Sequence, residues 1–507
     1  MARDTGVECN TPVIRVSADA ARVNYEPVMT AVRDATDTIS VRRTGPSGIA
    51  GNGPLFIASL ERRTAFFHDP PLSRIPQLVK SIECGRLPTD DADAVVKHDP
   101  QTTTLPLPDT GPLSVGHRLV LGPCGWVNPL DPAQHTFVST STTAETMADI
   151  GLLGRGRRDA AATESVADVW ETTREIDGDP VVVVNANETR EEQCADRTLL
   201  TATPMTVLDG IAVVAEYIGA EDAVLYLNET DTHLHQHLQA AIDAAGDNLP
   251  VIPKLVAGPD EYRAGEPTAA LEVLEGADRI EPRLQPPTPA EYGLYGRPTV
   301  IHTPRTFAHV HRLLTNPDAY DSDASDPGTR LVTVTGDVAN PATVELSSDS
   351  SLAAVRDAVE MEGSFKMACV GGVLGGITRD LDVAPTAQSL RAAGFGTDGV
   401  VELLADDCCA LAIVGERARF ASMENSGRCV PGREGTKQLA ELLRNIYHGS
   451  FESDKIRELG RVMRQSSNCQ IGAHAPRPVT TALEEFEPEF RAHTDGHCPS
   501  GTCTEKL

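Results

Sequence analysis

A run of four valines that ends in a polar turn, Asp179-Pro-Val-Val-Val-Val-Asn-Ala-Asn-Glu188, constrains the fold more than any other stretch. A strand that is apolar on both faces must be covered on both sides, as in a parallel sheet between helices. The following segments agree, because residues 203–219 carry an apolar helical stripe and residues 222–230 have a second strand pattern. Strands that alternate with helices predict an α/β unit here.

Several units are expected, because 507 residues are too many for one hydrophobic core. Residues 11–100 show a βαββα order, with the last helix ending near Cys84, which fits a small α/β unit. Residues 97–116 are rich in Pro, Thr and Asp and are interpreted as a linker. The last hundred residues are mostly helical, with apolar stripes. We predict an α/β multidomain fold with units at 1–100, 117–325, 326–380 (β-rich) and 405–507 (helical).

The chain is strongly acidic, with 73 acidic and 44 basic residues, a net charge of −29, and only seven lysines. This charge would repel phosphate, so no nucleic acid and no anionic membrane surface is expected as a partner. The acids are scattered among apolar runs, which favours a globular protein adapted to high salt, where charges are screened within about 3 Å at 1 M.

Two further expectations concern location and cysteine chemistry. No apolar run approaches the roughly 20 residues of a membrane span, so a cytoplasmic protein without direct membrane insertion is expected. The eleven cysteines of such a chain are interpreted as buried thiols or metal ligands and not as disulfides.

Three stretches are candidates for ligand binding. The turn Asn185 to Glu188 follows a parallel strand, where such sheets bind ligands, although on the residues alone a simple strand-ending turn is favoured. Glycines in residues 151–159 have backbone amides that could approach a phosphate, or form a plain turn. Residues 258–270 lead into a helix whose start, at Gly265 and Glu266, could hold a ligand or only a helix cap.

Histidine and cysteine pairs suggest metal sites, each with a simpler alternative. His233 and His237 have the i, i+4 spacing of zinc ligands, but no third ligand is placed, so surface histidines are the alternative. Cys408 and Cys409 are adjacent and cannot easily share one tetrahedral ion, which favours buried thiols. The tail pair, Cys498 and Cys503, is either a redox or metal handle or part of a disordered terminus.

Five runs together resemble one family over nearly the whole chain: the NADH-binding flavoprotein subunit, of the F type, in respiratory complex I and in NAD(P)-reducing hydrogenases. The runs are VVNANETREEQCADRTLL, GPDEYRAGEPTAALEVLEG, EPRLQPPTPAEYGLYGRPTVIHTPRTFAHV, ENSGRCVPGREGT and HCPSGTC. The resemblance implies a thioredoxin-like two-iron ferredoxin unit, a Rossmann-like FMN/NADH domain, a β-grasp (SLBB-like) unit and a helical bundle of the four-iron cluster type. It also implies electron transfer from NADH through FMN to other subunits of an oxidoreductase complex.

Carried over by position, the resemblance places FMN contacts and cluster ligands on particular residues. Cys429 and Cys469 would be two of the four thiolate ligands of a four-iron cluster, since Ser426 and Gly432 stand at the other two comb positions. The FMN contacts would be Gly154, Arg155, Gly156, Asn185, Asn187, Glu188, Tyr262, Gly265, Glu266 and Thr306.

The sequence departs from the family pattern at residues that would contact FMN and NADH. The glycine-rich FMN loop continues here as Arg157, Arg158 and Asp159, where side chains would crowd the backbone that approaches a phosphate, although arginines could pair with it. Pro267 replaces a carboxylate beside the nicotinamide, and Arg190 replaces an acid after the Asn185 turn. We expect NADH binding to be affected more than FMN binding.

The iron sites depart as well. Two thiolates rarely hold a four-iron cluster unless Cys408, Cys409 or the tail pair Cys498 and Cys503 supply further ligands, so none is expected. Pro46 and Ala50 replace loop cysteines of the N-terminal unit, so no two-iron cluster is expected there either.

Three functions stay open on this basis. The first is FMN-dependent electron transfer from NADH to a partner protein or quinone-linked complex, impaired or altered. The second is a non-catalytic structural or docking subunit that retains the fold. The third is a flavin protein that uses another reductant.

Overall fold

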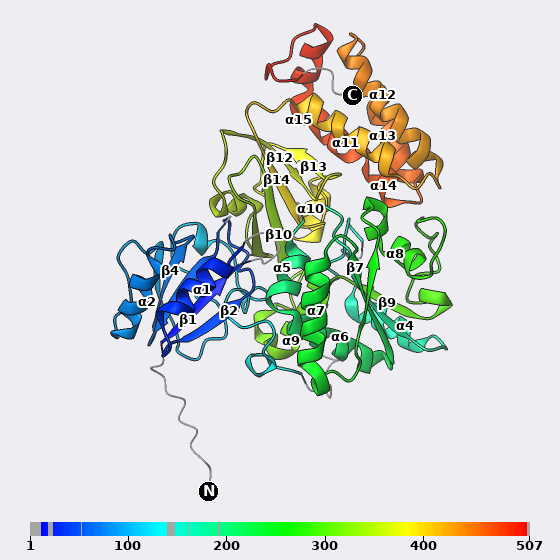
Figure 1. Ribbon diagram of the computed structural model, residues 1–507. Helices are drawn as coiled ribbons and strands as arrows, with labels where there is room; N and C mark the ends of the chain where they lie inside the picture. The colour runs from blue at the N-terminus through cyan, green and yellow to red at the C-terminus, as the bar shows by residue number, and fades with distance from the viewer. Residues whose placement is uncertain are drawn as a thin grey trace.

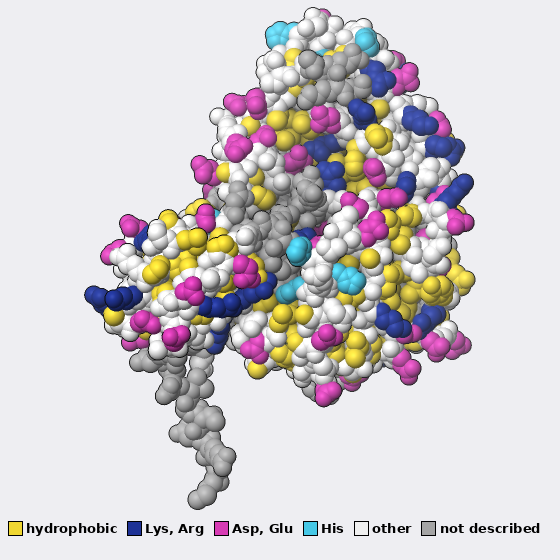
Figure 2. Space-filling view, in the orientation of Figure 1, with side chains coloured by type: hydrophobic (Ala, Val, Ile, Leu, Met, Phe, Trp, Pro, Cys, Tyr) yellow, Lys and Arg dark blue, Asp and Glu magenta, His cyan; other side chains and the backbone are white. Residues whose placement is uncertain are grey.

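The computed structural model describes residues 12–18, 24–51, 53–138, 147, 149–160, 162–190 and 193–503. Three sheets, with helices packed on and between them, lead into a C-terminal group of helices (Figure 1). The predicted α/β multidomain class is confirmed. Acidic side chains are scattered over the face drawn in Figure 2, with basic side chains between them.

The N-terminal sheet has the order β2-β1-β3-β4-β5, in which only β1 and β2 are parallel. Alternation along β3 sends Phe56 and Ala58 toward helices α1 and α2, and Leu55 and Ile57 toward the opposite face. The elements are β1 (Val13–Ser17), α1 (Glu26–Ala35), β2 (Ser40–Thr44), β3 (Leu55–Leu60), β4 (Arg63–His68), α2 (Ile75–Glu83) and β5 (Ala94–Lys97).

This unit has more structure than the sequence pattern predicts. Strands β4 and β5 are additional, since β4 pairs with β3 through a two-residue turn at Glu61 and Arg62. The segment interpreted as a linker covers the second face of the sheet, where Leu105 is buried with Trp126. It lacks periodicity because it packs as an irregular strap.

The second sheet is entirely parallel, with the order β8-β7-β6-β9. All six residues of β6 are buried, as the valine run predicts. The strands are β6 (Val181–Ala186), β7 (Asp222–Asn228), β8 (Lys254–Gly258) and β9 (Thr299–His302). The helices are α4 (Val166–Glu175), α5 (Ala195–Ala202), α6 (Pro204–Ile218), α7 (Thr232–Ala245), α8 (Pro267–Leu274) and α9 (Pro304–Thr315).

The strand order of this sheet positions a site. The chain leaves β6 to form β7 and β8 on one side and returns to form β9 on the other. The order therefore reverses between β6 and β9, and the crevice beyond their carboxyl ends is where such sheets bind ligands.

The third sheet, β11-β10-β14-β12-β13, lies between the parallel sheet and the C-terminal helices (Figure 1). Its elements are β10 (Thr329–Gly336), β11 (Ala342–Ser347), β12 (Phe365–Val370), β13 (Gly376–Thr378), α10 (Ala387–Ala392) and β14 (Val400–Ala405).

The C-terminal bundle packs α11, α12 and α15 around a core that includes Leu443 and Phe486. Its helices are α11 (Ala410–Glu424), α12 (Thr436–Tyr447), α13 (Ser453–Ser466), α14 (Gln470–His474) and α15 (Pro476–Thr494). Within the described residues no single helix has the length and apolar character needed to cross a membrane, and one bent pair, α5 with α6, meets those criteria only when taken together.

Candidate functional site

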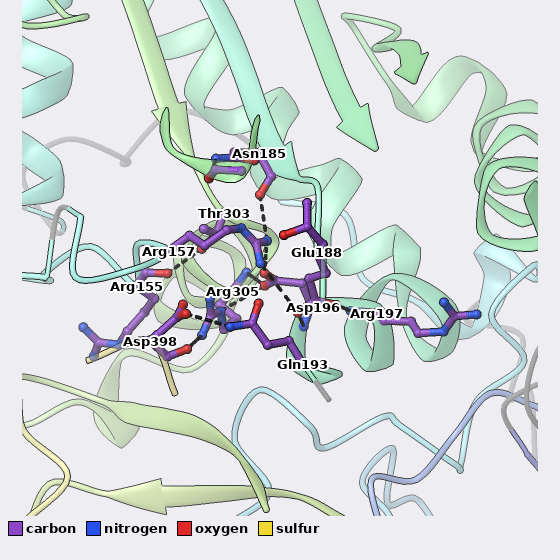
Figure 3. A network of polar contacts seen from close by, with 12 residues as sticks. Arg155, Arg157, Asn185, Glu188, Gln193, Asp196, Arg197, Thr303, Arg305 and Asp398 are labelled. Carbon is purple, nitrogen blue, oxygen red and sulfur yellow. Dashed lines mark hydrogen bonds and ion pairs between the residues drawn. The ribbon is translucent and has the colours of Figure 1, made fainter. Parts of the chain in front are cut away.

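The residues singled out in the sequence converge at the carboxyl end of β6 (Figure 3). The Arg155 amide donates to Thr306 Oγ1 at 2.9 Å, which ties the glycine loop to α9. The Asn185 side-chain amide donates to the Gly265 carbonyl at 3.0 Å, which ties β6 to the start of α8. Four distant segments are thus brought together around one point.

Arg157, which lies at that point, is buried to 1% exposure. Its Nη2 is 2.6 Å from Asp196 Oδ2 and donates to the Asn185 carbonyl at 3.2 Å. Asp196 is fully buried and also binds the Arg305 Nε at 3.0 Å (Figure 3). A buried carboxylate held by two guanidinium groups is a fixed arrangement, because without the carboxylate two buried positive charges would lose their counter-charge.

Arg158 fills the neighbouring space with its side chain. Its guanidinium carbon lies 3.6 Å from the centre of the Tyr262 ring, in a cation–π contact. Its Nη2 is 2.7 Å from the position that a Cβ at Gly265 would occupy. The backbone of Arg158 has φ +55°, in the left-handed region, and its amide donates to Asp398 Oδ1 at 2.9 Å. Burial lowers the pKa of Arg158.

Asp159 connects the same loop to the two C-terminal units. Its carboxylate accepts hydrogen bonds from Thr397 and lies 2.8 Å from Arg477 Nη2 of α15. Burial would raise the pKa of Asp159, but Arg477 and His474 outweigh burial and lower it. Burial also lowers the pKa of His474 to about 4, so Arg477 is the charged partner at neutral pH. Residues 157–159 therefore join the parallel sheet, the third sheet and the bundle.

Three of the candidate contacts already have partners within the protein. The guanidinium of Arg155 donates to the carbonyls of Thr329 and Pro327 and pairs with Asp326 at 2.9 Å. Glu266 caps α8 by accepting from the Ala269 amide, which matches the helix-cap alternative. Glu188 accepts from the amides of Asp196 and Arg197 at the start of α5, and burial together with Asp196 raises its pKa to about 7.

Five buried polar atoms around the two arginines have no hydrogen-bond partner within the described residues. They are Arg157 Nε, Arg158 Nε, Arg158 Nη1, Asn185 Oδ1 and Asn187 Oδ1. Buried polar groups normally find partners, so this packing is incompletely satisfied.

The second candidate site, between α14 and the turn before α12, brings Cys429 and Cys469 together. Their sulfurs are 3.3 Å apart, and the amides of Gly432 and Gly472 each donate to one sulfur at 3.3 Å. A Cβ built at Gly432 would lie 3.0 and 3.1 Å from the two sulfurs. The two thiols thus meet, as the sequence predicts, in a closely packed space.

Comparison with known proteins decides the family. The chain matches the Nuo51 FMN-binding domain over residues 147–312 and the NADH-ubiquinone oxidoreductase-F iron–sulfur binding region over residues 412–493. It is 31% identical to the F subunit of NADH-quinone oxidoreductase in Streptomyces coelicolor over 378 residues, covering 69% of this chain and 82% of that one. The chain belongs to the NADH-quinone oxidoreductase-F family.

A hydrogenase relative and one solved fold agree. The chain is 29% identical over 354 residues to the NADP-reducing hydrogenase subunit HndC of Solidesulfovibrio fructosivorans, covering 64% of this chain and 71% of that one. An NAD+-reducing [NiFe]-hydrogenase, in its H2-reduced state, matches with a TM-score of 0.65 and 24% identity, covering 96% of this chain and 84% of that chain. The latter similarity supports the fold alone.

This member of the oxidoreductase-F family therefore contains the FMN-binding domain and the iron–sulfur region that the resemblance implies. The side chains inside the first do not fit FMN in this arrangement. Ligand pockets hold roughly 300–1,000 Å³, whereas the cavity lined by Arg158, Tyr262 and Glu266 holds about 20 Å³. A larger cleft, of about 690 Å³, lies outside it, and Glu188 is the one predicted FMN contact that lines it.

The iron–sulfur region gives a similar result. A four-iron cluster binds four thiolates, each on a different iron, and two are present here with their sulfurs in contact at 3.3 Å. The backbone of Gly432 packs closely against both sulfurs and against Gly472. This thiol pair fits part of an iron–sulfur site, and the packed space around it does not fit a complete four-iron cluster.

The sequence predicts that Arg157 and Arg158 crowd the loop, but it did not reveal the buried ionic network of Asp196 and Arg305. Asp196 and Arg305 lie inside runs quoted for the resemblance, but no pattern showed that Arg157 would turn inward to reach them. A buried acid in a family-like run, beside a new arginine in the facing loop, is the signal that could have found the pair. His233 and His237 lie on α7 as predicted, and neither belongs to a group of three possible ligands among the described residues.

Proposed function

We propose that this chain is a non-catalytic structural or docking subunit of an oxidoreductase complex, in which the family fold is retained and the redox sites are closed. The observation that carries this proposal is the buried ion pair between Arg157, in the loop that would hold FMN, and Asp196 of α5. A flavin there would have to displace a guanidinium from a buried carboxylate, which is strongly unfavourable.

The finer parts of the fold belong to the same proposal. We infer that residues 1–100, 117–325, 326–380 and 405–507 correspond to the thioredoxin-like, Rossmann-like, β-grasp and four-iron-type units of the family. A docking subunit needs its fold and not bound cofactors. Apolar contacts stabilise each unit without a ligand. The relatives named above are subunits of NADH-quinone oxidoreductase and of NADP-reducing hydrogenase, which supports a partner complex here.

The visible spectrum of the anaerobically purified full-length chain tests this function. We expect neither flavin nor iron–sulfur absorbance, also after incubation with FMN. One bound FMN per chain that NADH reduces in a stopped-flow experiment would contradict the proposal. Bound FMN that NADH fails to reduce would support the flavin protein with another reductant.

A variant that removes the two arginine side chains tests directly whether they block FMN binding. We predict that the double variant Arg157→Gly, Arg158→Ala binds FMN measurably, seen as quenching of flavin fluorescence, because the two side chains that fill the pocket are removed. The matched control is Arg174→Ala on α4, whose guanidinium contacts the Tyr217 ring outside the site; it should behave like the unchanged chain. FMN affinity that is equal in all three chains would show that the arginines do not close the pocket.

FMN-dependent electron transfer from NADH is the second candidate, and one observation favours it. The side-chain oxygens of Asn185 and Asn187 are buried without hydrogen-bond partners in the described structure. Both belong to the predicted flavin turn, and a donor from a ligand would satisfy them. This candidate requires the two arginines to leave the pocket.

A further inference from the structure

Four side chains that the proposed function does not use meet where α11 begins and α15 ends. Cys409 precedes the first turn of α11, His493 lies in the last turn of α15, and Cys498 and Cys503 lie in the tail. Each offers one ligand atom, and all four atoms lie within 4.8 Å of one another. Helix α15, a 19-residue element with a kink at Phe486, separates this cluster from the Cys429–Cys469 pair.

The distances suit a single tetrahedral ion. With Zn–S of about 2.3 Å and Zn–N of about 2.0 Å, the ligand atoms of a tetrahedral site are about 3.5–3.8 Å apart. His493 Nε2 is 3.4 Å from Cys409 Sγ and 3.0 Å from Cys503 Sγ. A small adjustment would therefore admit one ion. The thiolates of a four-iron cluster bind different irons and lie farther apart, so this cluster is too compact for one.

The histidine is oriented as a metal ligand. His493 Nδ1 lies 2.6 Å from the Glu489 carbonyl, so Nδ1 carries the proton and donates it. Nε2 is then the free acceptor, and it faces the thiols. The Tyr447 ring packs edge-on against the imidazole, with centroids 5.3 Å apart, and His493 is 4% exposed. The ring orientation is thus fixed before any ion binds.

We propose that Cys409, His493, Cys498 and Cys503 form a structural zinc site. Three thiolates and one imidazole in a closed tetrahedron are a common donor set of structural zinc. The ion would bind the thiolates, and the thiol protons would be released to solvent. No open coordination position is left, so the site is structural.

The site would hold the tail on the bundle. Thr502 Oγ1 donates to the Asp407 carbonyl at 2.5 Å, so the tail already contacts the turn before α11. Cys498 and Cys503 pack against the bundle core. Zinc would join the start of α11, the end of α15 and the tail. This inference does not depend on whether the chain binds FMN.

Metal analysis of the full-length chain, purified without added metal, tests the site. We expect about one zinc per chain by mass spectrometry. Cys503→Ser and His493→Gln should each lose most of it. The matched controls are Cys84→Ser, which removes an exposed thiol at the end of α2, and Cys429→Ala, which removes one thiol of the other pair. Both controls should keep the zinc.

A second measurement covers a variant that fails to fold. The unchanged chain, stripped with chelator and titrated with Co2+, should develop the intense ligand-field bands of tetrahedral thiolate cobalt at one equivalent. Reactive thiols should fall by three when Zn2+ is restored. A stripped chain that gives octahedral cobalt spectra, zinc that persists in both ligand variants, or iron with labile sulfide at this site would overturn the proposal.

Discussion

At the scale of single residues, Asp196 supplies the negative charge at the centre of the site. It is fully buried and binds both Arg157 and Arg305. We predict that Asp196→Asn lowers the free energy of unfolding by about 3–5 kcal/mol, because two buried guanidinium groups lose their counter-charge. The measurement is urea unfolding followed by circular dichroism.

An exposed ion pair provides the control for that substitution. Asp454 is fully exposed and lies 3.8 Å from Arg457 on α13. Exposed pairs contribute about 0–1 kcal/mol, so Asp454→Asn should leave unfolding almost unchanged. Equal effects of the two substitutions would show that the Asp196 network does not stabilise the fold.

At the scale of elements, the loop of residues 157–159 joins three units through Asp159. Burial would raise the pKa of Asp159, but Arg477 and His474 outweigh burial, so this pKa is lowered in the folded chain. The stabilisation is therefore fully present above the pKa of an unfolded aspartate and is lost as pH falls through the lower folded pKa. A hydrogen-bonded charged group contributes about 1.5–3 kcal/mol.

The prediction is that Asp159→Asn removes this contribution at neutral pH and makes the loop amides exchange faster with deuterium. The difference from the unchanged chain should shrink as pH falls into the acidic range. Asp168→Asn, an exposed residue in the first turn of α4, is the control. A difference that stays constant across that pH range would argue against an ionised Asp159.

Some elements were predictable from sequence and others were not. The strand β6 was predicted because four consecutive valines put apolar side chains on both faces of a strand, so both faces must be buried. The strands β4 and β5 were missed because polar residues bound short apolar stretches there, and only pairing with β3 stabilises them. Of the two interpretations of the tail pair, the disordered terminus is wrong up to residue 503, because Cys498 and Cys503 pack on core residues of the bundle helices.

At the scale of the whole molecule, the contacts within the candidate site were likewise only partly predictable from sequence. Sequence reasoning identified which segments converge, because a resemblance fixes their order. It could not predict that Arg157 would reach Asp196, or that Cys409 and the tail would meet His493. Each contact joins residues that are far apart in the sequence but belong to the same unit, so it depends on how loops and helix ends pack there, which no local pattern encodes.

The charge of the whole chain leads to a last prediction. A net charge of −29 repels itself within one folded molecule, and only seven lysines offset it. Screening shortens the range of that repulsion from about 10 Å at 0.1 M salt to about 3 Å at 1 M. We therefore expect the thermal unfolding midpoint to rise by several degrees when KCl is raised over this range, as measured by scanning calorimetry.

Screening can be separated from salting-out by the choice of salt. Because screening depends on ionic strength, chloride and sulfate at equal ionic strength should raise the midpoint equally at the low end of the range. Sulfate should exceed chloride only at high concentration, where its exclusion from the protein surface strengthens apolar burial. A midpoint that does not change in KCl would show that the acidic surface does not destabilise the fold at low salt, and the expected adaptation to high salt would then be wrong.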